Sequence, residues 1–177
     1  MSNQTAATRS PYRRLTASAM FAAMIAVTTA YLFHIPVGAN GGYLHFGDAF
    51  IYLAASLLPL PYACAAAAIG GGVADLVSGA GAWMLPTMLI KPLAALVFTS
   101  RSHKLACARN SFGLIYGGFV TVAGYYLAEV VLTGGNWLAP AVSVWANVIQ
   151  AAGSAAVYLV MAVAIDRFHV KPLLKLG

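Results

Sequence analysis

Four charged side chains lie inside apolar stretches of this chain and are its clearest candidates for chemistry: Asp48, Asp75, Lys91 and Glu129. The chain is 61% hydrophobic and 8% charged, with a mean hydropathy of +0.81, so we expect lipid rather than water around most of it. A charge inside a bilayer is costly and is therefore a functional candidate by default. Depth along the predicted helices places the three carboxylates in the outer half, with Asp48 at the outer surface.

Lys91 is the deepest of these charges. It lies near the middle of a predicted helix, roughly 12 Å below Trp83 at about 1.5 Å per residue, and cannot easily reach either surface. We therefore expect Lys91 to face a cavity or a carboxylate, either Asp75 or Glu129, or to contact an acceptor on a ligand. A purely structural ion pair between Asp75 and Lys91 is the alternative without a binding role.

Helical spacing indicates which polar residues share a face, because residues three or four apart are neighbours on a helix. Three stripes follow: Trp83, Thr87 and Lys91; Tyr125, Glu129 and Thr133; and Asn147, Gln150 and Ser154. The loop before residue 48 adds aromatics, a histidine, and glycines that would let it close over a ligand. The candidate substrate-binding residues are Tyr43, His45, Asp48, Asp75, Trp83, Thr87, Lys91, Tyr125, Glu129, Asn147 and Gln150.

Several of these residues also have structural explanations. Trp83, Trp137 and Tyr43 fit an outer belt of interfacial aromatics. Asn147 and Gln150 fit hydrogen bonds between neighbouring helices. His45 fits a loop at the outer surface better than a metal site. The concentration of polar groups in the outer half of separate helices nevertheless favours a binding site, because scattered structural polar groups would not converge there.

The elements that must position these residues are six transmembrane helices, since apolar runs of about 20 residues span a bilayer. The expected spans are 15–35, 48–60, 62–78, 83–99, 112–133 and 138–165, and the second is short for a full crossing. They use nearly all of the 177 residues. We therefore expect an all-α membrane protein that forms one integral-membrane domain over residues 1–177.

Basic residues predict the orientation of these spans. They precede the first span, separate the fourth from the fifth, and follow the sixth: Arg9, Arg13 and Arg14; Arg101, Lys104 and Arg109; Arg167, Lys171 and Lys175. Lys and Arg near helix ends are retained in the cytoplasm, so both termini are predicted to lie on the cytoplasmic side of a plasma membrane. These flanks account for the formal net charge of +6, and nucleic-acid binding is not expected.

The motifs of several protein classes are missing from the sequence. There is no phosphate-binding loop, so ATP binding by this chain is not expected. No zinc-protease, serine-hydrolase or paired-cysteine motif occurs, and four acidic residues offer few metal ligands. An enzyme, a resident metal and a cofactor are therefore not predicted. A selective ion channel is also unsupported, since no filter-like loop is present.

The first predicted span carries small residues at helical spacing: Ala19, Ala22, Ala23 and Ala26. Such a face lets another helix approach closely. The approaching helix could belong to a partner protein or to this same chain, and the spacing alone does not distinguish the two.

Three segments resemble the substrate-binding S components of energy-coupling factor (ECF) transporters, which import vitamins into bacteria. They are YLHFGD at 43–48, the glycine-rich GGGVADL at 70–76, and PTMLIK at 86–91. The resemblance covers the chain in size, span number and orientation, and is nearest to the riboflavin, pyridoxine and hydroxymethylpyrimidine carriers. A nickel or cobalt carrier is disfavoured, because Ser2 stands where those relatives have a histidine.

The resemblance implies a mechanism. Such a subunit binds its vitamin in an outward cavity closed by the first outer loop. It then docks on a transmembrane coupling subunit driven by two ATPases and rotates to release the ligand inside. Docking would use the small-residue face of the first helix, here Ala19, Ala23 and Ala26 with Ala22 on the adjoining register.

The expected ligand is a small heteroaromatic vitamin or vitamin precursor. Aromatic side chains suit a flat ring, and the carboxylates and amides suit ring nitrogens and hydroxyls. A pyridoxine-like or pyrimidine compound is favoured, while riboflavin and precursors of queuosine or cobalamin stay open. The alternatives from other classes are a self-sufficient, proton-coupled, homo-oligomeric secondary carrier and a structural membrane scaffold. We see no convincing internal repeat of the kind secondary carriers often show.

Overall fold

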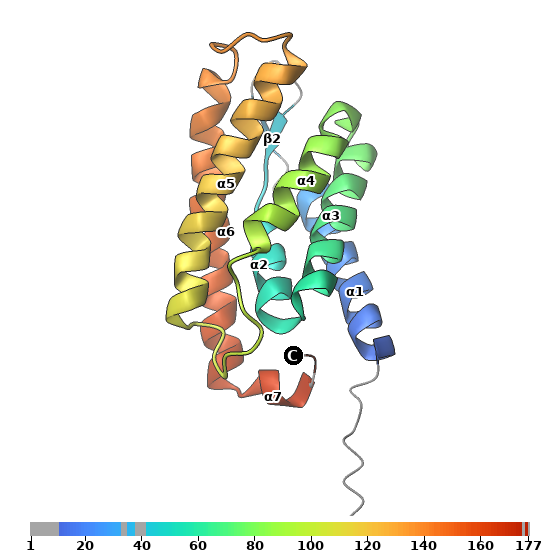
Figure 1. Ribbon diagram of the computed structural model, residues 1–177, viewed down its shortest axis with the longest axis vertical. Coiled ribbons are helices and arrows are strands. Elements are labelled where there is room, and N and C mark those ends of the chain that lie inside the picture. The colour runs from blue at the N-terminus through green and yellow to red at the C-terminus, as the bar shows by residue number, and fades with distance from the viewer. Residues whose placement is uncertain (1–10, 33–34, 38–41, 175, 177) are drawn as a thin grey trace, which may run out of the picture.

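The computed structural model describes residues 11–32, 35–37, 42–174 and 176, with the two short strands described by their backbone alone (Figure 1). The chain is almost entirely helical, as predicted, and adds a short two-stranded hairpin. Its elements are α1 (Pro11–Ala30), β1 (Ile35–Val37), β2 (Gly42–Leu44), α2 (Asp48–Leu57), α3 (Leu60–Val77), the 3-10 turn η1 (Gly81–Trp83), α4 (Met84–Ala95), α5 (Ala108–Leu132), α6 (Ala141–Arg167) and α7 (Val170–Leu174).

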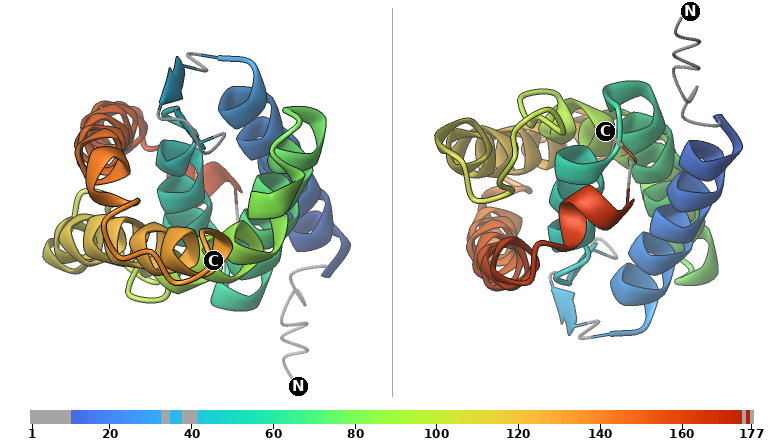
Figure 2. Two further views of the ribbon diagram at one scale, coloured as in Figure 1. Left: turned by 90° about the horizontal axis from the view of Figure 1, so that it is seen from above. Right: turned by 90° about the horizontal axis from the view of Figure 1, so that it is seen from below.

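Helix α2 is the centre of the bundle. The views along the bundle show α1, α3, α4, α5 and α6 around it (Figure 2). Every residue of α2 except Phe50 is buried. Its sequence, DAFIYLAASL, is small or apolar on all sides, which is the pattern of a helix enclosed by others. α2 is therefore the element against which the surrounding helices place their side chains.

The upper half of the bundle in Figure 1 is crossed by a strand before α2 begins. β1 and β2 pair antiparallel, with Pro36 opposite Tyr43, and β2 leads the chain down between the helices to α2 (Figure 1). A Cβ added at Gly47 would collide with the Thr29 hydroxyl of α1, so only glycine permits this close approach. Two predictions are corrected here: the first helix ends at Ala30 rather than 35, and Asp48 lies inside the bundle rather than at its surface.

Helices α1 and α3 pack through small residues. The buried face of α1 consists of Ser18, Ala22, Ile25, Thr29 and Ala30. A Cβ at Gly70 of α3 would lie 2.6 Å from the Ala22 carbonyl oxygen, so the two backbones approach closely at this point. Ala22 is thus an internal packing residue, and the prediction that it belongs to a docking face is wrong.

The three basic clusters lie at one end of the bundle. The start of α1, the segment between α4 and α5, and α7 all lie at the lower end in Figure 1. The Arg14 side chain donates to the Leu176 carbonyl oxygen at 3.2 Å, which joins the beginning and the end of the described chain. This arrangement agrees with an even number of crossings. Arg9 and Lys175 lie outside the described residues.

Within the described part of the chain, three helices are long and apolar enough to span a bilayer: α3, α5 and α6. α2 has 10 residues and α4 has 12, so neither crosses a full bilayer as a helix alone. Large apolar side chains are exposed on the outside of the bundle, including Leu85, Ile115 and Val131 at 72%, 73% and 77%. Such a surface fits lipid and supports a multi-pass membrane protein.

Candidate ligand-binding site

A buried ion pair lies at the start of α2. The Lys91 ammonium nitrogen is 2.6 Å from Asp48 Oδ1, and both side chains are 2% exposed. Gln150 Nε2 donates to the other oxygen, Oδ2, at 3.2 Å. Burial of two charges is tolerated when they are paired and further hydrogen bonded, as they are here. We call Asp48, Lys91 and Gln150 the Asp48 network.

This pairing corrects the predicted partner of Lys91, which was Asp75 or Glu129. The prediction placed Asp48 at the outer surface because it opens a predicted span. Since β2 carries the chain inward first, Asp48 instead meets Lys91 deep in the bundle. As the first residue of α2, the Asp48 carboxylate also lies at the positive end of the helix dipole.

Separate helices supply the other members of the Asp48 network. Lys91 projects from α4 where it packs on α3, and a Cβ at Gly71 would lie 2.7 Å from Thr87 Cγ2 and 3.4 Å from Lys91 Cγ. Gln150 projects from α6 and is 2% exposed. Its Oε1 accepts the backbone N–H of His45 at 3.4 Å, which ties the end of the hairpin to the network.

His45 is buried, which corrects the prediction that it lies in a loop at the outer surface. It is 4% exposed, and its Nδ1 accepts the backbone N–H of Gly47 at 3.0 Å. The chain between β2 and α2 is further held by Phe46, whose ring packs where a Cβ at Gly153 would stand. Tyr43 lies on β2, where no side chain is described, so its role stays a prediction.

Aromatic side chains lie beside the Asp48 network. The Tyr125 ring centroid is 5.8 Å from that of Trp83 and 5.0 Å from Lys91 Nζ. The hydroxyls of Thr87 and Tyr125 are hydrogen bonded at 2.9 Å. Trp83 is 8% exposed, whereas Trp137 is 61% exposed, so the interfacial-belt explanation suits Trp137 and not Trp83. The stripe of Trp83, Thr87 and Lys91 therefore faces the interior, as its spacing predicts.

Asp75 and Glu129 lie in the last turns of α3 and α5, and Asn147 lies in the second turn of α6. Asp75 is 4% exposed and lies one turn beyond Gly71, on the face of α3 that packs on α4. Glu129 is 1% exposed and lies one turn beyond Tyr125, and its Oε1 accepts the Ser143 hydroxyl at 3.1 Å. Asn147 is partly buried, on the turn of α6 before Gln150. Neither carboxylate, Asp75 or Glu129, is the ion-pair partner of Lys91.

A second polar cluster lies at the opposite end of α2, and sequence reasoning missed it. Asn110 is fully buried, and its Nδ2 donates to Ser56 Oγ at 3.1 Å and to the Leu105 carbonyl at 3.0 Å. The Ser56 hydroxyl also bonds the Tyr158 hydroxyl at 2.8 Å. We call Ser56, Asn110 and Tyr158 the Asn110 network. An asparagine just before the predicted start of an apolar helix was the available signal.

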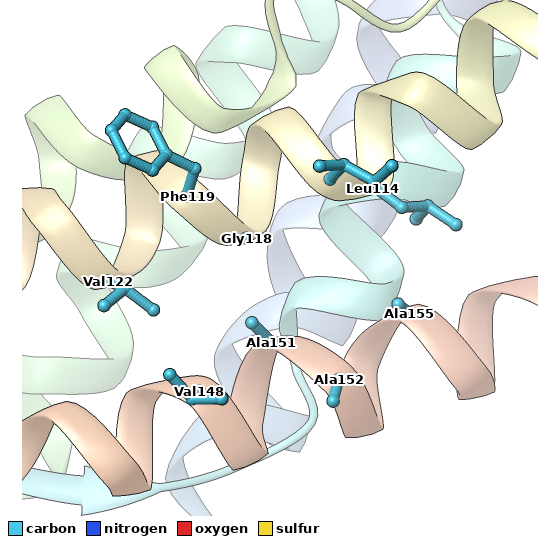
Figure 3. A pocket seen from close by; sticks show the side chains of 9 residues that line it. Leu114, Gly118, Phe119, Val122, Val148, Ala151, Ala152 and Ala155 are labelled. Carbon is cyan, nitrogen blue, oxygen red and sulfur yellow. The ribbon is translucent and has the colours of Figure 1, made fainter.

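A groove on the outer surface has a different character. It runs between α5 and α6 and is lined by Leu114, Ile115, Gly118, Phe119, Val122, Val148, Ala151, Ala152 and Ala155 (Figure 3). These side chains are all apolar or absent, and none is a predicted site residue. The groove offers no group that would select a vitamin, so we do not assign the site there. Among the described residues, no three His, Cys, Asp or Glu side chains are grouped to hold a metal ion.

The alanines of α1 divide into two sets. Ala19 and Ala23 are exposed and Ala26 is half-buried, so this register faces outward. Ala22 faces α3. Packing within the chain, one of the two explanations left open by the sequence, is confirmed for Ala22, and docking of a partner on the outward register stays a prediction.

A buried ion pair, an aromatic pair and a lipid-facing exterior define a membrane protein with a polar centre of the kind that binds a small ligand. The comparison with known families makes this specific: the chain belongs to the ECF-type riboflavin transporter S component family, which matches residues 10–167. This confirms the resemblance seen in the sequence, and the family is one of transporter subunits rather than enzymes. An uncharacterized protein from Pyrococcus woesei is 36% identical over 107 residues, 60% of this chain and 72% of that protein.

Proposed function

We propose that this protein is the substrate-specific subunit of an ECF-type ABC importer and captures a small heteroaromatic vitamin or precursor on the outer side of the membrane. Partner subunits would use ATP to drive uptake. The family supports this role. The observation that carries the proposal is the charged Asp48 network beside Trp83 and Tyr125 inside an apolar bundle. Charges inside a membrane are costly, so the ones that are present usually serve a function.

The chemistry of the Asp48 network favours a ligand that offers hydrogen-bond acceptors. Both Asp48 oxygens already accept bonds, from Lys91 and Gln150. The Lys91 ammonium has three donors, and one is used by Asp48. A ring nitrogen or carbonyl would take another, while the rings of Trp83 and Tyr125 stack on the flat ligand. Tyr43, His45, Asp75, Thr87, Glu129 and Asn147 would complete the site.

The proposal places the whole chain, residues 1–177, in the bacterial plasma membrane as one domain with six spans and cytoplasmic termini. The common position of the basic clusters supports this orientation. In this arrangement α2 is a half-span that fills the cytoplasmic half of the bundle. The backbone of β2, enclosed by helices, crosses the outer half, as irregular backbone in a membrane must be enclosed by protein or line a cavity.

Ligand identity is tested by native mass spectrometry of the detergent-purified protein, followed by titration with riboflavin, pyridoxine and hydroxymethylpyrimidine. We expect one ligand to bind stoichiometrically. Trp83→Ala should weaken that binding, whereas Trp137→Ala at the exposed surface should not. Failure of every compound and of every co-purified heteroaromatic molecule would contradict the proposal.

Docking is tested with neighbouring alanines of α1. Ala23 is exposed, so Ala23→Leu should leave ligand affinity intact and block co-purification with the coupling subunit and its two ATPases. Ala22→Leu is the matched control: the added side chain would be forced against α3, lowering stability by about 1–3 kcal/mol. Normal assembly of the Ala23→Leu protein would rule out docking through Ala19, Ala23 and Ala26.

Dependence on ATPase partners is tested by uptake in cells with and without an ECF coupling module. The proposed subunit should lose most transport when the module is absent. Undiminished uptake would instead support a self-sufficient secondary carrier.

A further inference from the structure

Helices α2 and α6 keep a constant register over two turns. Gln150 bonds Asp48 near the start of α2, and Tyr158 bonds Ser56 near its end, and each pair is separated by 102 residues. Two bonds with the same offset, eight residues apart, mean that the helices run side by side in the same direction. The residues midway between them, Tyr52 and Ser154, are also 102 apart and therefore face each other.

Helix α5 packs against α2 at the level of Tyr52. A Cβ at Gly117 would lie 2.9 Å from Tyr52 Cε1 and 3.1 Å from its hydroxyl, so α5 meets α2 at Tyr52. Thr121 lies one turn beyond Gly117 and one turn before Tyr125, on the same face. Its hydroxyl is therefore on the side of α5 that meets Tyr52, and neither hydroxyl has a hydrogen-bond partner among the described residues. We call Tyr52, Thr121 and Ser154 the hydroxyl layer.

The hydroxyl layer is buried and unsatisfied. Tyr52 is 1% exposed, and Thr121 and Ser154 are fully buried. Their three oxygens have no hydrogen-bond partner in the part of the chain that the structure describes. Thr121 and Ser154 do not even bond the carbonyl one turn back in their own helices, as Ser56 and Thr133 do. A buried hydroxyl left without a hydrogen-bond partner destabilises the folded state.

We propose that the hydroxyl layer is an internal water site that joins the Asp48 network to the Asn110 network. Buried waters typically make about three hydrogen bonds to polar groups that would otherwise be unsatisfied. Three hydroxyls from three helices supply that number, and each acts as donor or acceptor as the water requires. The site lies one helical turn below Asp48 and one turn above Ser56. Bound water adds a third polar layer along α2, between the two networks.

Thermal unfolding of the detergent-purified, ligand-free protein tests this site without relying on the transport proposal. The variants are Tyr52→Phe, Thr121→Val, Ser154→Ala and their triple combination. Around a shared water, each single change leaves the other two hydroxyls and the water poorly satisfied. We expect each to lower the unfolding midpoint by about 2–4 °C. The triple variant should lose clearly less than the sum of the three.

The alternatives give different patterns. A dry layer would make each single variant equal to or more stable than the wild type, because an unsatisfied hydroxyl is removed. Additive losses would mean independent packing effects, and coupling confined to Tyr52 and Thr121 would mean a direct hydroxyl pair; any of these overturns the proposal. Thr28→Val is the matched control, since the Thr28 hydroxyl bonds the Met24 carbonyl of its own helix at 2.6 Å. A high-resolution structure should show water density between the three oxygens, and its absence would also overturn the proposal.

Discussion

The two polar networks at the ends of α2 differ in charge and in saturation. The Asp48 network contains a lysine and a carboxylate, and the Lys91 ammonium retains donors beyond its bond to Asp48. The Asn110 network is neutral and closes largely on backbone: Asn110 Oδ1 accepts the N–H of Thr99 at 2.8 Å, and the Tyr158 hydroxyl donates to the Leu105 carbonyl at 3.0 Å. The first retains hydrogen-bond donors that a further molecule could accept, whereas the donors and acceptors of the second are largely used by the protein itself.

We expect the Asp48 network to bind the ligand and the Asn110 network to close the end of the bundle. Around the Asn110 network, the Asp166 carboxylate accepts the N–H groups of Leu105 and Ala106, and Lys171 of α7 donates to the Ser56 carbonyl. These bonds hold the segment between α4 and α5, together with α7, over the end of α2. We therefore expect substitutions at Asn110 to reduce stability and those at the Asp48 network to reduce ligand binding as well.

The largest effect is expected from Lys91→Met. It leaves the Asp48 carboxylate buried without its cation, which should lower the free energy of unfolding by about 3–5 kcal/mol and abolish ligand binding. Thermal unfolding and ligand titration measure the two effects. Lys104→Met, at an exposed lysine, is the control and should change neither.

The double variant Asp48→Asn with Lys91→Met sharpens this result. Removing both charges should restore most of the stability, because no unpaired buried charge remains. Ligand binding should stay lost. Recovery of binding in the double variant would show that the ion pair is structural and would remove the functional contrast between the two networks.

Asn110→Ala should have the next largest effect, on stability alone. It removes bonds to Ser56, Thr99 and Leu105 and should lower the free energy of unfolding by about 2–4 kcal/mol. Affinity for the ligand, measured well below the unfolding midpoint, should be unchanged within twofold or so. A strong loss of affinity in the folded variant would contradict the division of roles.

Gln150→Leu should lower both stability and ligand affinity, each by a smaller amount. Asp48 loses one hydrogen bond but keeps Lys91, so the loss of stability should be about 1–2 kcal/mol. Ligand affinity should fall about tenfold, equivalent to about 1.4 kcal/mol. Titration of Gln150→Leu beside Asn147→Leu shows whether α6 acts through the Asp48 network or at its outer end.

Lys171→Met should have the smallest effect. The Lys171 ammonium bonds the Ser56 carbonyl at the end of α2, a contact worth about 0.3–1 kcal/mol. Burial lowers the pKa of Lys171 in the folded protein. As pH rises through that lowered pKa, the folded state loses the proton first. The free-energy cost of burying the charge therefore falls until the pH reaches the pKa of Lys171 in the unfolded chain. The stability advantage of the wild type over the variant should therefore grow from neutral to alkaline pH. An unchanged difference would mean that the group is solvated.

Much of the fold could be predicted from the sequence because apolar length and helical spacing are local properties. The predicted spans at 62–78, 112–133 and 138–165 correspond to α3, α5 and α6 within a few residues. The interior face of Trp83, Thr87 and Lys91 was also predictable. The hairpin was not, because its strands are only three residues each and their pairing joins residues with no shared pattern.

Individual partners in the candidate site were less predictable. The first residue of the helix at Asp48 was predicted correctly, but the strand before it carries the chain into the bundle, and the assignment of Asp48 to the surface failed for that reason. The Asn110 network and the hydroxyl layer depend on three helices meeting at one level. Single serines, threonines and tyrosines are too common in apolar helices to signal such a meeting.

The sequence by itself determined that this chain is helical, lipid-facing and charged at a few interior positions, and that its basic ends lie together. Composition and period decide those features, because each helix must bury or expose its own faces. Only the tertiary structure decided that Lys91 pairs with Asp48, that Ala22 packs inward while Ala23 stays outside, and that three hydroxyls share one layer. These depend on the register between helices, which is set by close packing around glycines and by a strand that carries the chain into the bundle.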